Sequence, residues 1–191
     1  MSSVAFLLLS KLMEFTERDY LEEEVRVEVT GRSVKVPLHE GITELSRGAE
    51  YIIPRWLALA LEKDGVVRIR GEELSIEKLS SIVYNEEALV KKLQLTKLPR
   101  FFYLLNKKYI DALKEKLTAS ADISLLEEYK HREDLFFTIA RLRVKKLLNF
   151  ILLAGLPQEI ADKLSEEEKM LYNSLKSVLD SWMKSLGLEK A

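Results

Sequence analysis

The feature that most constrains the fold is the segment from Glu50 to Arg70, EYIIPRWLALALEKDGVVRIR. Pro54 suits the first turn of a helix, because its missing N–H would have no partner within the helix there. Residues 56–61 are all apolar, so we expect a short buried helix, and Gly65 suits the left-handed residue that ends it. Val66–Arg70 then alternates apolar and basic side chains, which predicts a half-buried strand. The segment therefore predicts a change from β structure to helices.

The chain before this segment has the alternation that is typical of strands. Residues 24–29 place three valines on one face and charged side chains on the other. Gly31-Arg32 suits a two-residue hairpin loop, so residues 34–36 are expected to form the return strand, which Pro37 ends. Residues 41–48 are interpreted as a polar loop bracketed by glycines. These strands predict a small β-rich domain.

An apolar segment, VAFLLL, lies near the start of the chain at residues 4–9. No basic residues precede it, no small-residue cleavage site follows it, and it is too short to span a bilayer. We therefore interpret it, with Leu12, Met13 and Phe15, as a short buried helix or strand rather than a signal peptide or a membrane span.

Four helices and one short connecting segment are expected after the β-rich part. Apolar residues recur at spacings of three and four in each helix, Ser75 can cap the first, and Ser165 with Glu168 forms a capping box for the last. The expected helices span about 75–93, 100–117, 124–154 and 165–186, with the short segment ending at Leu164. The chain is thus predicted to be an α+β protein: a small β-rich domain with one short helix over residues 1–72, then an α-helical bundle domain over residues 73–191.

The third expected helix carries a basic residue on its apolar side. A polar stripe runs from Asp134 to Asn149 and includes Arg141 and Lys145. At 100° per residue, Arg143 falls among apolar side chains on the opposite side. A basic group there is costly unless it is paired, so Arg143 is expected to be buried against another helix or across a subunit interface. The candidate partners are a group of another subunit or one of three carboxylates of this chain, Asp111, Glu115 and Asp180.

The sequence has no recognisable catalytic or metal-binding motif. It has no cysteine, and its two histidines, His39 and His131, lack a second histidine or cysteine at ligand spacing. No P-loop, GxGxxG or nucleophile-elbow pattern is present. We therefore expect no enzyme activity, no metal and no cofactor.

Basic residues are numerous but dispersed. The net charge is −1, and acidic residues lie among the basic ones throughout the chain. The strongest cluster is Arg141, Arg143, Lys145 and Lys146, yet Arg143 points away from Arg141 and Lys145. Specific DNA-binding proteins usually carry a basic excess, so a solvated helix face is favoured over a DNA site. Any DNA contact is expected to be weak or indirect.

The third expected helix has more apolar surface than one partner helix could cover. Large apolar patches usually mark protein–protein contacts, and the aromatic run after Pro99 is interpreted in the same way, as core or interface packing. The residues assigned to an interface are Phe101, Phe102, Phe136, Phe137, Arg143, Leu148, Leu152 and Trp182. The residues assigned to organising the fold are Pro54, Trp56, Leu57 and Gly65. The residues alone thus indicate an interaction subunit.

Two short segments carry a resemblance to a known family. PRWLALAL, which starts at Pro54 and is followed by Gly65 and an apolar strand, resembles the "proline, aromatic, leucine" segment of GINS replication proteins. IARLRV, residues 139–144, resembles a segment in the helical domain of the Psf-two-type GINS subunit. The order of a β domain before a helical domain is similar to that of the archaeal subunit of the Psf-two/Psf-three type.

The resemblance implies a non-enzymatic structural subunit of the DNA replication machinery. Two copies of it and two of a sister subunit would form a heterotetramer, located in the cytoplasm with the nucleoid. This complex would be a helicase accessory factor that bridges the MCM helicase and a RecJ-like (Cdc-forty-five-related) protein at the replication fork.

A second hypothesis belongs to another functional class. The β segment and the Pro54 helix could form a winged-helix-like module of a DNA-binding regulator. Salt-dependent binding to duplex DNA would distinguish the two hypotheses.

Overall fold

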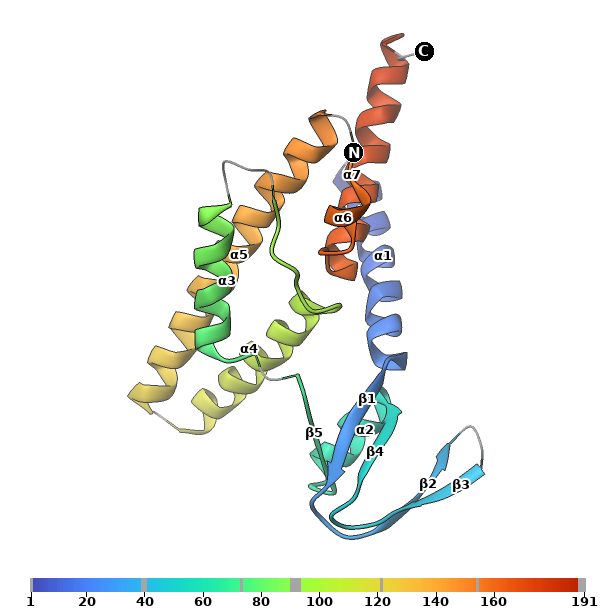
Figure 1. The fold of residues 1–191 in the computed structure, drawn as a ribbon, viewed down its shortest axis with the longest axis vertical. Coiled ribbons are helices and arrows are strands. Elements are labelled where there is room, and N and C mark those ends of the chain that lie inside the picture. Colours follow the sequence, from blue (N-terminus) through green and yellow to red (C-terminus); the bar gives the residue numbers. More distant parts are fainter. Residues whose placement is uncertain are drawn as a thin grey trace. The chain divides into compact units, whose positions relative to one another are not determined.

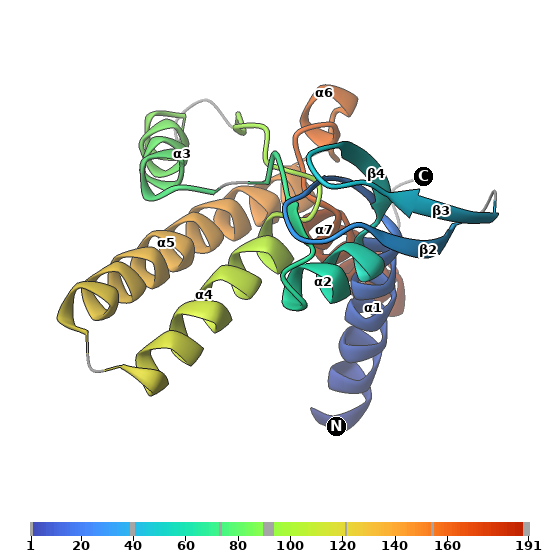
Figure 2. The same ribbon diagram turned by 90° about the horizontal axis from the view of Figure 1, so that it is seen from below.

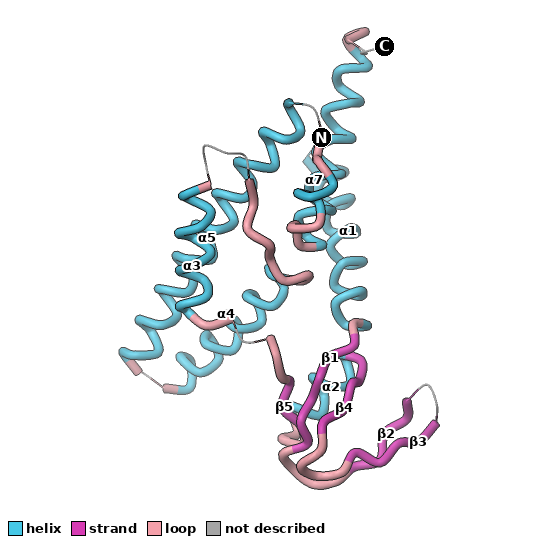
Figure 3. Tube along the Cα trace, in the orientation of Figure 1, coloured by secondary structure: helices cyan, strands magenta, loops and turns pink. Residues whose placement is uncertain are grey.

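The computed structural model describes residues 2–38, 41–72, 74–89, 94–120, 122–153 and 155–188. The chain divides into two compact units, Met1–Glu73 and Leu74–Ala191. All the strands described lie in the first unit, and the regular structure described in the second unit is helical (Figure 3). The protein therefore belongs to the α+β class, as the sequence predicts, with a small strand-rich region before a helical region.

The elements of the first unit are, in order, α1 (Ser2–Glu22), β1 (Glu24–Val29), β2 (Val34–Leu38), β3 (Gly41–Leu45), β4 (Glu50–Pro54), α2 (Arg55–Lys63) and β5 (Val67–Ile69). Strand β1 lies between β4 and β5 in one antiparallel sheet (Figure 1). Strands β2 and β3 pair in a second, two-stranded sheet. The three valines of β1 are buried, as their alternation predicts, and they pack with one face of α2.

The predicted hairpin between residues 24–29 and 34–36 is wrong. Strand β2 continues past Pro37 and pairs with β3, which lies in the segment that was expected to be a polar loop. Gly31 is needed for a different reason: a Cβ atom there would lie 2.6 Å from the carbonyl oxygen of Gly65. The Gly31 N–H donates to the carbonyl oxygen of Val66 at 2.9 Å. The glycine therefore permits close approach of two backbone segments rather than a tight hairpin turn.

Two expectations about buried helices are also wrong. Helix α1 has 21 residues rather than being a short buried element, and Leu7 and Phe15 on it are exposed. Helix α2 buries a single face, which includes Leu57, while Trp56 is 51% exposed. The C-terminal end of α2 is as predicted, because Gly65 follows it with φ +68°. Pro54 lies one residue earlier than predicted, as the N-cap residue rather than in the first turn.

The elements of the second unit are α3 (Ile76–Ala88), α4 (Phe102–Ala119), α5 (Ile123–Leu153), α6 (Gln158–Ala161) and α7 (Glu166–Ser185). Helices α3 and α4 both pack along α5 (Figures 1 and 2). The first turns of α7 pack on the second half of α5, where Leu147, Phe150 and Tyr172 share a buried cluster. Helix α5 is thus the element on which the other helices converge.

The starts of α3 and α7 follow the predicted capping pattern. The Ser75 side chain accepts the Lys78 N–H, and Ser165 and Glu168 form the full capping box. Helix α3 ends at Ala88, earlier than predicted, and residues 90–93 of the predicted helix lie outside the described residues. Satisfying the exposed N–H groups of a helix start lowers its free energy by about 1 kcal/mol, which is why this local signal is reliable.

Candidate functional site

Arg143 occupies the centre of the helical unit. It lies on α5 and has no exposed surface. This confirms the prediction from helical periodicity that Arg143 is buried. Its Nε and Nη2 donate to the Glu168 carboxylate at 2.8 and 2.6 Å. Its Nη1 donates to Glu86 at 3.0 Å and to the carbonyl oxygen of Thr96 at 2.8 Å, and Nη2 also reaches the Lys163 carbonyl oxygen at 3.2 Å. The guanidinium group is therefore fully satisfied.

A second buried cation lies one turn further along α5. Lys146 is 3% exposed, and its Nζ donates to a Glu86 carboxylate oxygen at 2.6 Å and to the Glu86 carbonyl oxygen at 2.8 Å. It also donates to the carbonyl oxygen of Gln94 at 3.1 Å. We call Glu86, Arg143, Lys146 and Glu168 the Arg143 network. Two cations and two anions balance in it, which is the condition under which buried charges are tolerated.

The predicted partners of Arg143 within this chain are wrong. Asp111 and Glu115 are exposed on α4, and Asp180 pairs with Lys176 at 2.8 Å. The true partners had signals in the sequence that were missed. Glu86 occupies the position seven residues after Leu79 in the apolar stripe of α3, and Glu168 serves both its own helix cap and Arg143. Glu86 lies within the apolar stripe of α3, just as Arg143 lies within that of α5. Two opposite charges placed in this way on neighbouring helices are expected to pair with each other.

The charges of the Arg143 network shift the pKa values of its members. Burial alone would raise the pKa of Glu86, but the hydrogen bond from Lys146 and the charge of Arg143 outweigh it and lower that pKa. Burial alone would lower the pKa of Arg143, and the hydrogen bonds and charge of Glu168 raise it instead. Because the folded pKa of Glu86 is depressed, its stabilising contribution is present above the ordinary carboxyl range and is lost as the pH falls through the folded pKa.

The N-termini of α4 and α7 meet beside this network. The Glu166 N–H donates to the Arg100 carbonyl oxygen at 2.7 Å, and the Leu104 N–H donates to Glu167 Oε1 at 3.0 Å. The Tyr103 hydroxyl donates to Glu168 Oε1 at 2.9 Å. We call this contact of residues 100–104 with residues 166–168 the α4–α7 junction. The Glu168 carboxylate, in the capping box of α7, offsets the partial positive charge of that helix start.

The junction corrects two interface predictions. Phe101 and Phe102 are 1% and 0% exposed, so they belong to the core of this chain and are not on a surface. The rings of Phe102 and Tyr103 meet edge to face, with their centroids 5.2 Å apart. The ring centroid of half-buried Phe136 lies 5.7 Å from that of Tyr103. Arg143 is likewise satisfied inside the chain rather than across a subunit interface.

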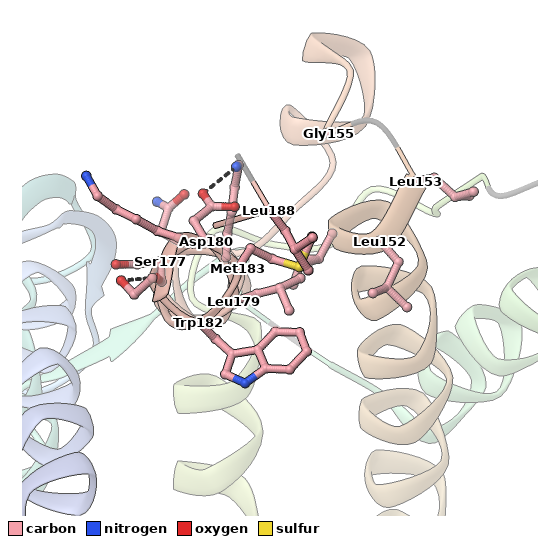
Figure 4. A pocket seen from close by; sticks show the side chains of 14 residues that line it. Leu152, Leu153, Gly155, Ser177, Leu179, Asp180, Trp182, Met183 and Leu188 are labelled. Atoms are coloured by element: carbon pink, nitrogen blue, oxygen red, sulfur yellow. Dashed lines mark hydrogen bonds and ion pairs between the residues drawn. The ribbon is translucent and has the colours of Figure 1, made fainter. Parts of the chain in front are cut away.

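The other predicted interface residues lie on exposed surface. Phe137, Leu148, Leu152 and Trp182 are all exposed, on α5 and α7. Leu152 and Trp182 line a groove between the end of α5 and the C-terminal half of α7 (Figure 4). Figure 4 shows Leu179 and Met183 of α7, and Leu188 just after it, extending toward the end of α5. We call the surface formed by Leu152, Leu153, Leu179, Trp182, Met183 and Leu188 the α5–α7 groove.

The apolar face of α7, which includes Trp182 of the groove, changes its environment along the helix. In the first turns, Glu168 and Tyr172 on that face are buried. Further along the same face, at spacings of three and four residues, Val178, Trp182 and Leu186 are 69%, 55% and 53% exposed. An amphipathic helix normally buries its apolar face along its whole length. The C-terminal half of α7 therefore presents an apolar face that lacks cover within the described residues.

The first unit contains a second buried arginine that sequence reasoning missed. Arg55, the first residue of α2, is 1% exposed and its Nε donates to the Tyr20 carbonyl oxygen at 2.9 Å. It pairs with the carboxylates of Glu23 and Glu72, and its guanidinium lies 4.1 Å from the centre of the Tyr20 ring. It thus ties the end of α1 and the end of the unit to α2. Sequence reasoning missed it because attention went to the apolar residues 56–61, which follow Arg55 directly.

Neither charged cluster resembles a catalytic centre, because their charged groups are directed at one another rather than at open space. In the part of the chain that the structure describes, no group of three or more histidine, cysteine, aspartate or glutamate side chains could hold a metal ion. His39 lies outside that part, and His131 is exposed on α5. No described helix is both long enough and apolar enough to cross a membrane.

Comparison with protein-family models found no match to this chain, and comparison with curated proteins found none either.

Proposed function

We propose that this chain is a non-enzymatic structural subunit of the GINS type, which joins a sister subunit through its helical unit. The observation that carries the proposal is the α5–α7 groove. Leu152 is 71% and Trp182 is 55% exposed there, and both face the same opening. Exposed apolar surface of this kind marks protein–protein contact, and tryptophan is enriched among the residues that dominate binding.

The subunit would act by position and not by bond chemistry. A helix of the sister subunit would lie in the α5–α7 groove, in a heterotetramer of two copies of each subunit. The resemblance of PRWLALAL and IARLRV to GINS segments extends the proposal to its partners, the MCM helicase and a RecJ-like (Cdc-forty-five-related) protein. The site of action would be the replication fork, in the cytoplasm with the nucleoid.

The regulator hypothesis receives less support from the first unit. A DNA-reading helix needs exposed cations that reach phosphates or bases. Helix α2 has two basic residues: Arg55 is buried and paired, which leaves Lys63. Trp56, the large exposed side chain of α2, suits a protein contact better than a DNA groove.

The test is a pull-down of the tagged full chain from native extract. We expect the wild type to retain the helicase and the RecJ-like protein with a sister subunit. Leu152→Ser with Trp182→Ser should lose them by at least about tenfold, since two apolar anchors of the proposed interface are removed. Ile123→Ser is the matched control, because Ile123 is 74% exposed at the other end of α5. Retention of the same partners by the double variant, or their absence from the wild-type sample, would count against the proposal.

A further inference from the structure

The α4–α7 junction contains a buried acid that the Arg143 network does not use. Glu167 is 6% exposed, and its Oε1 accepts the Leu104 N–H at 3.0 Å. Its Oε2 is buried and has no hydrogen-bond partner among the described residues. The adjacent Glu168 differs, because Arg143, Tyr103 and the Ser165 N–H all donate to it. Glu167 is thus a half-satisfied carboxyl group beside a fully satisfied carboxylate.

The charged surroundings of Glu167 do not supply the missing contact. The titratable and charged groups of the junction and the adjoining network are Arg100 and Tyr103 from the α4 side, Arg143 from α5, and Glu166 and Glu168 from α7. Arg100 pairs with Glu166 at 3.4 Å, and both Tyr103 and Arg143 donate to Glu168. The nearest charge of α7, on Glu168, repels a second negative charge.

We propose that Glu167 is a proton-sensitive latch of the α4–α7 junction. With the carboxyl group protonated, Glu167 accepts the Leu104 N–H without carrying a charge into the core. When the proton leaves, a buried anion with one unsatisfied oxygen favours opening of the junction to water. This device does not depend on the assembly function proposed above.

The direction of the pH dependence follows from the surroundings of the carboxyl group. Burial raises the pKa of Glu167, and the charge of Glu168 adds to this; hydrogen bonds from the Leu104 N–H, the Ser165 hydroxyl and the Glu167 N–H only partly oppose it. An acid with a raised folded pKa favours the closed, folded form at low pH. The stabilisation of the closed junction by Glu167 is therefore present below the ordinary carboxyl range. It is lost as the pH rises through the pKa of Glu167 in the folded chain. Glu86, whose pKa is lowered, has the opposite dependence.

Hydrogen exchange of the full chain tests the latch. We expect the protection factor of the Leu104 amide, corrected for intrinsic exchange, to fall at least about threefold between about pH 4.5 and about pH 7.5. Glu167→Gln should abolish the fall, because its amide oxygen can accept the same N–H but cannot ionise. Glu166→Gln, a half-buried neighbour on the same turn, should keep it. A flat wild-type profile, or an equal fall in Glu167→Gln, would overturn the proposal.

A direct titration keeps the test independent of the variants. The side-chain carboxyl carbon of Glu167 can be followed by NMR in the wild-type chain. We expect its midpoint above the ordinary glutamate value. A midpoint at or below that value would overturn the proposal even if Glu167→Gln failed to fold.

Discussion

Replacing Arg143 with alanine should lower the free energy of unfolding of the helical unit by about 3–5 kcal/mol. The substitution removes a guanidinium group that binds two carboxylates and two carbonyl oxygens in the absence of solvent. Glu86 keeps Lys146 as a partner, but Glu168 is left as a buried anion with its main cation gone. The cost of stranding that anion, more than the loss of attraction, sets the size of the effect.

The measurement is denaturant unfolding of the full chain followed by the helical circular-dichroism signal. Arg141→Ala is the matched control, since Arg141 is exposed on the same helix and should cost under about 1 kcal/mol. In a double-mutant cycle, Arg143→Ala with Glu168→Ala should cost less than the sum of the two single changes. Equal, small losses for Arg143→Ala and Arg141→Ala would show that the Arg143 network is hydrated in solution.

Replacing Arg55 with alanine should destabilise the first unit by about 3 kcal/mol and leave the second unit nearly unchanged. The arginine is 1% exposed and pairs with Glu23 and Glu72, whose side chains are 24% and 20% exposed. Those partners can regain some water, so the loss should be smaller than for Arg143. The Tyr20 ring would also lose the guanidinium stacked against it.

The two tryptophans allow the units to be monitored separately. Trp56 lies in the first unit and Trp182 in the second. In a Trp182→Phe background, Arg55→Ala should shift the Trp56 fluorescence transition to lower denaturant concentration. Arg68→Ala, at an exposed position of β5, is the control. It should lower the free energy of unfolding of the first unit by less than about 1 kcal/mol. A shift of the helical signal as large as the shift at Trp56 would mean that Arg55 does not act on the first unit alone.

Local signals in the sequence predicted local features of the structure well. Ser75 and Ser165 cap helices, and Gly65 ends α2, because each needs only a few neighbouring residues to have its effect. The burial of Arg143 followed from helical periodicity in the same way. Strand pairing was not predicted: Gly31 suits a tight turn by composition, yet here it admits the backbone of Gly65, which is distant in sequence.

The sequence predicted only part of the candidate site: the burial of Arg143 but not its partners. Periodicity placed Arg143 inside a stripe, but its partners lie on α3 and α7, and spacing within one helix cannot identify a contact between helices. A search for charged residues within the apolar stripe of each predicted helix would also have found Glu86 in α3. Phe101 and Phe102 were misassigned because aromatic residues occur in both cores and interfaces, and sequence does not separate the two.

The purified chain alone should associate with itself. Because the α5–α7 groove lacks its partner helix in that sample, sedimentation equilibrium should show concentration-dependent self-association or aggregation above the monomer mass of 22.1 kDa. Addition of the sister subunit should replace it with a defined complex of two plus two chains. A stable monomer of 22.1 kDa at high concentration, unchanged by the sister subunit, would contradict the account.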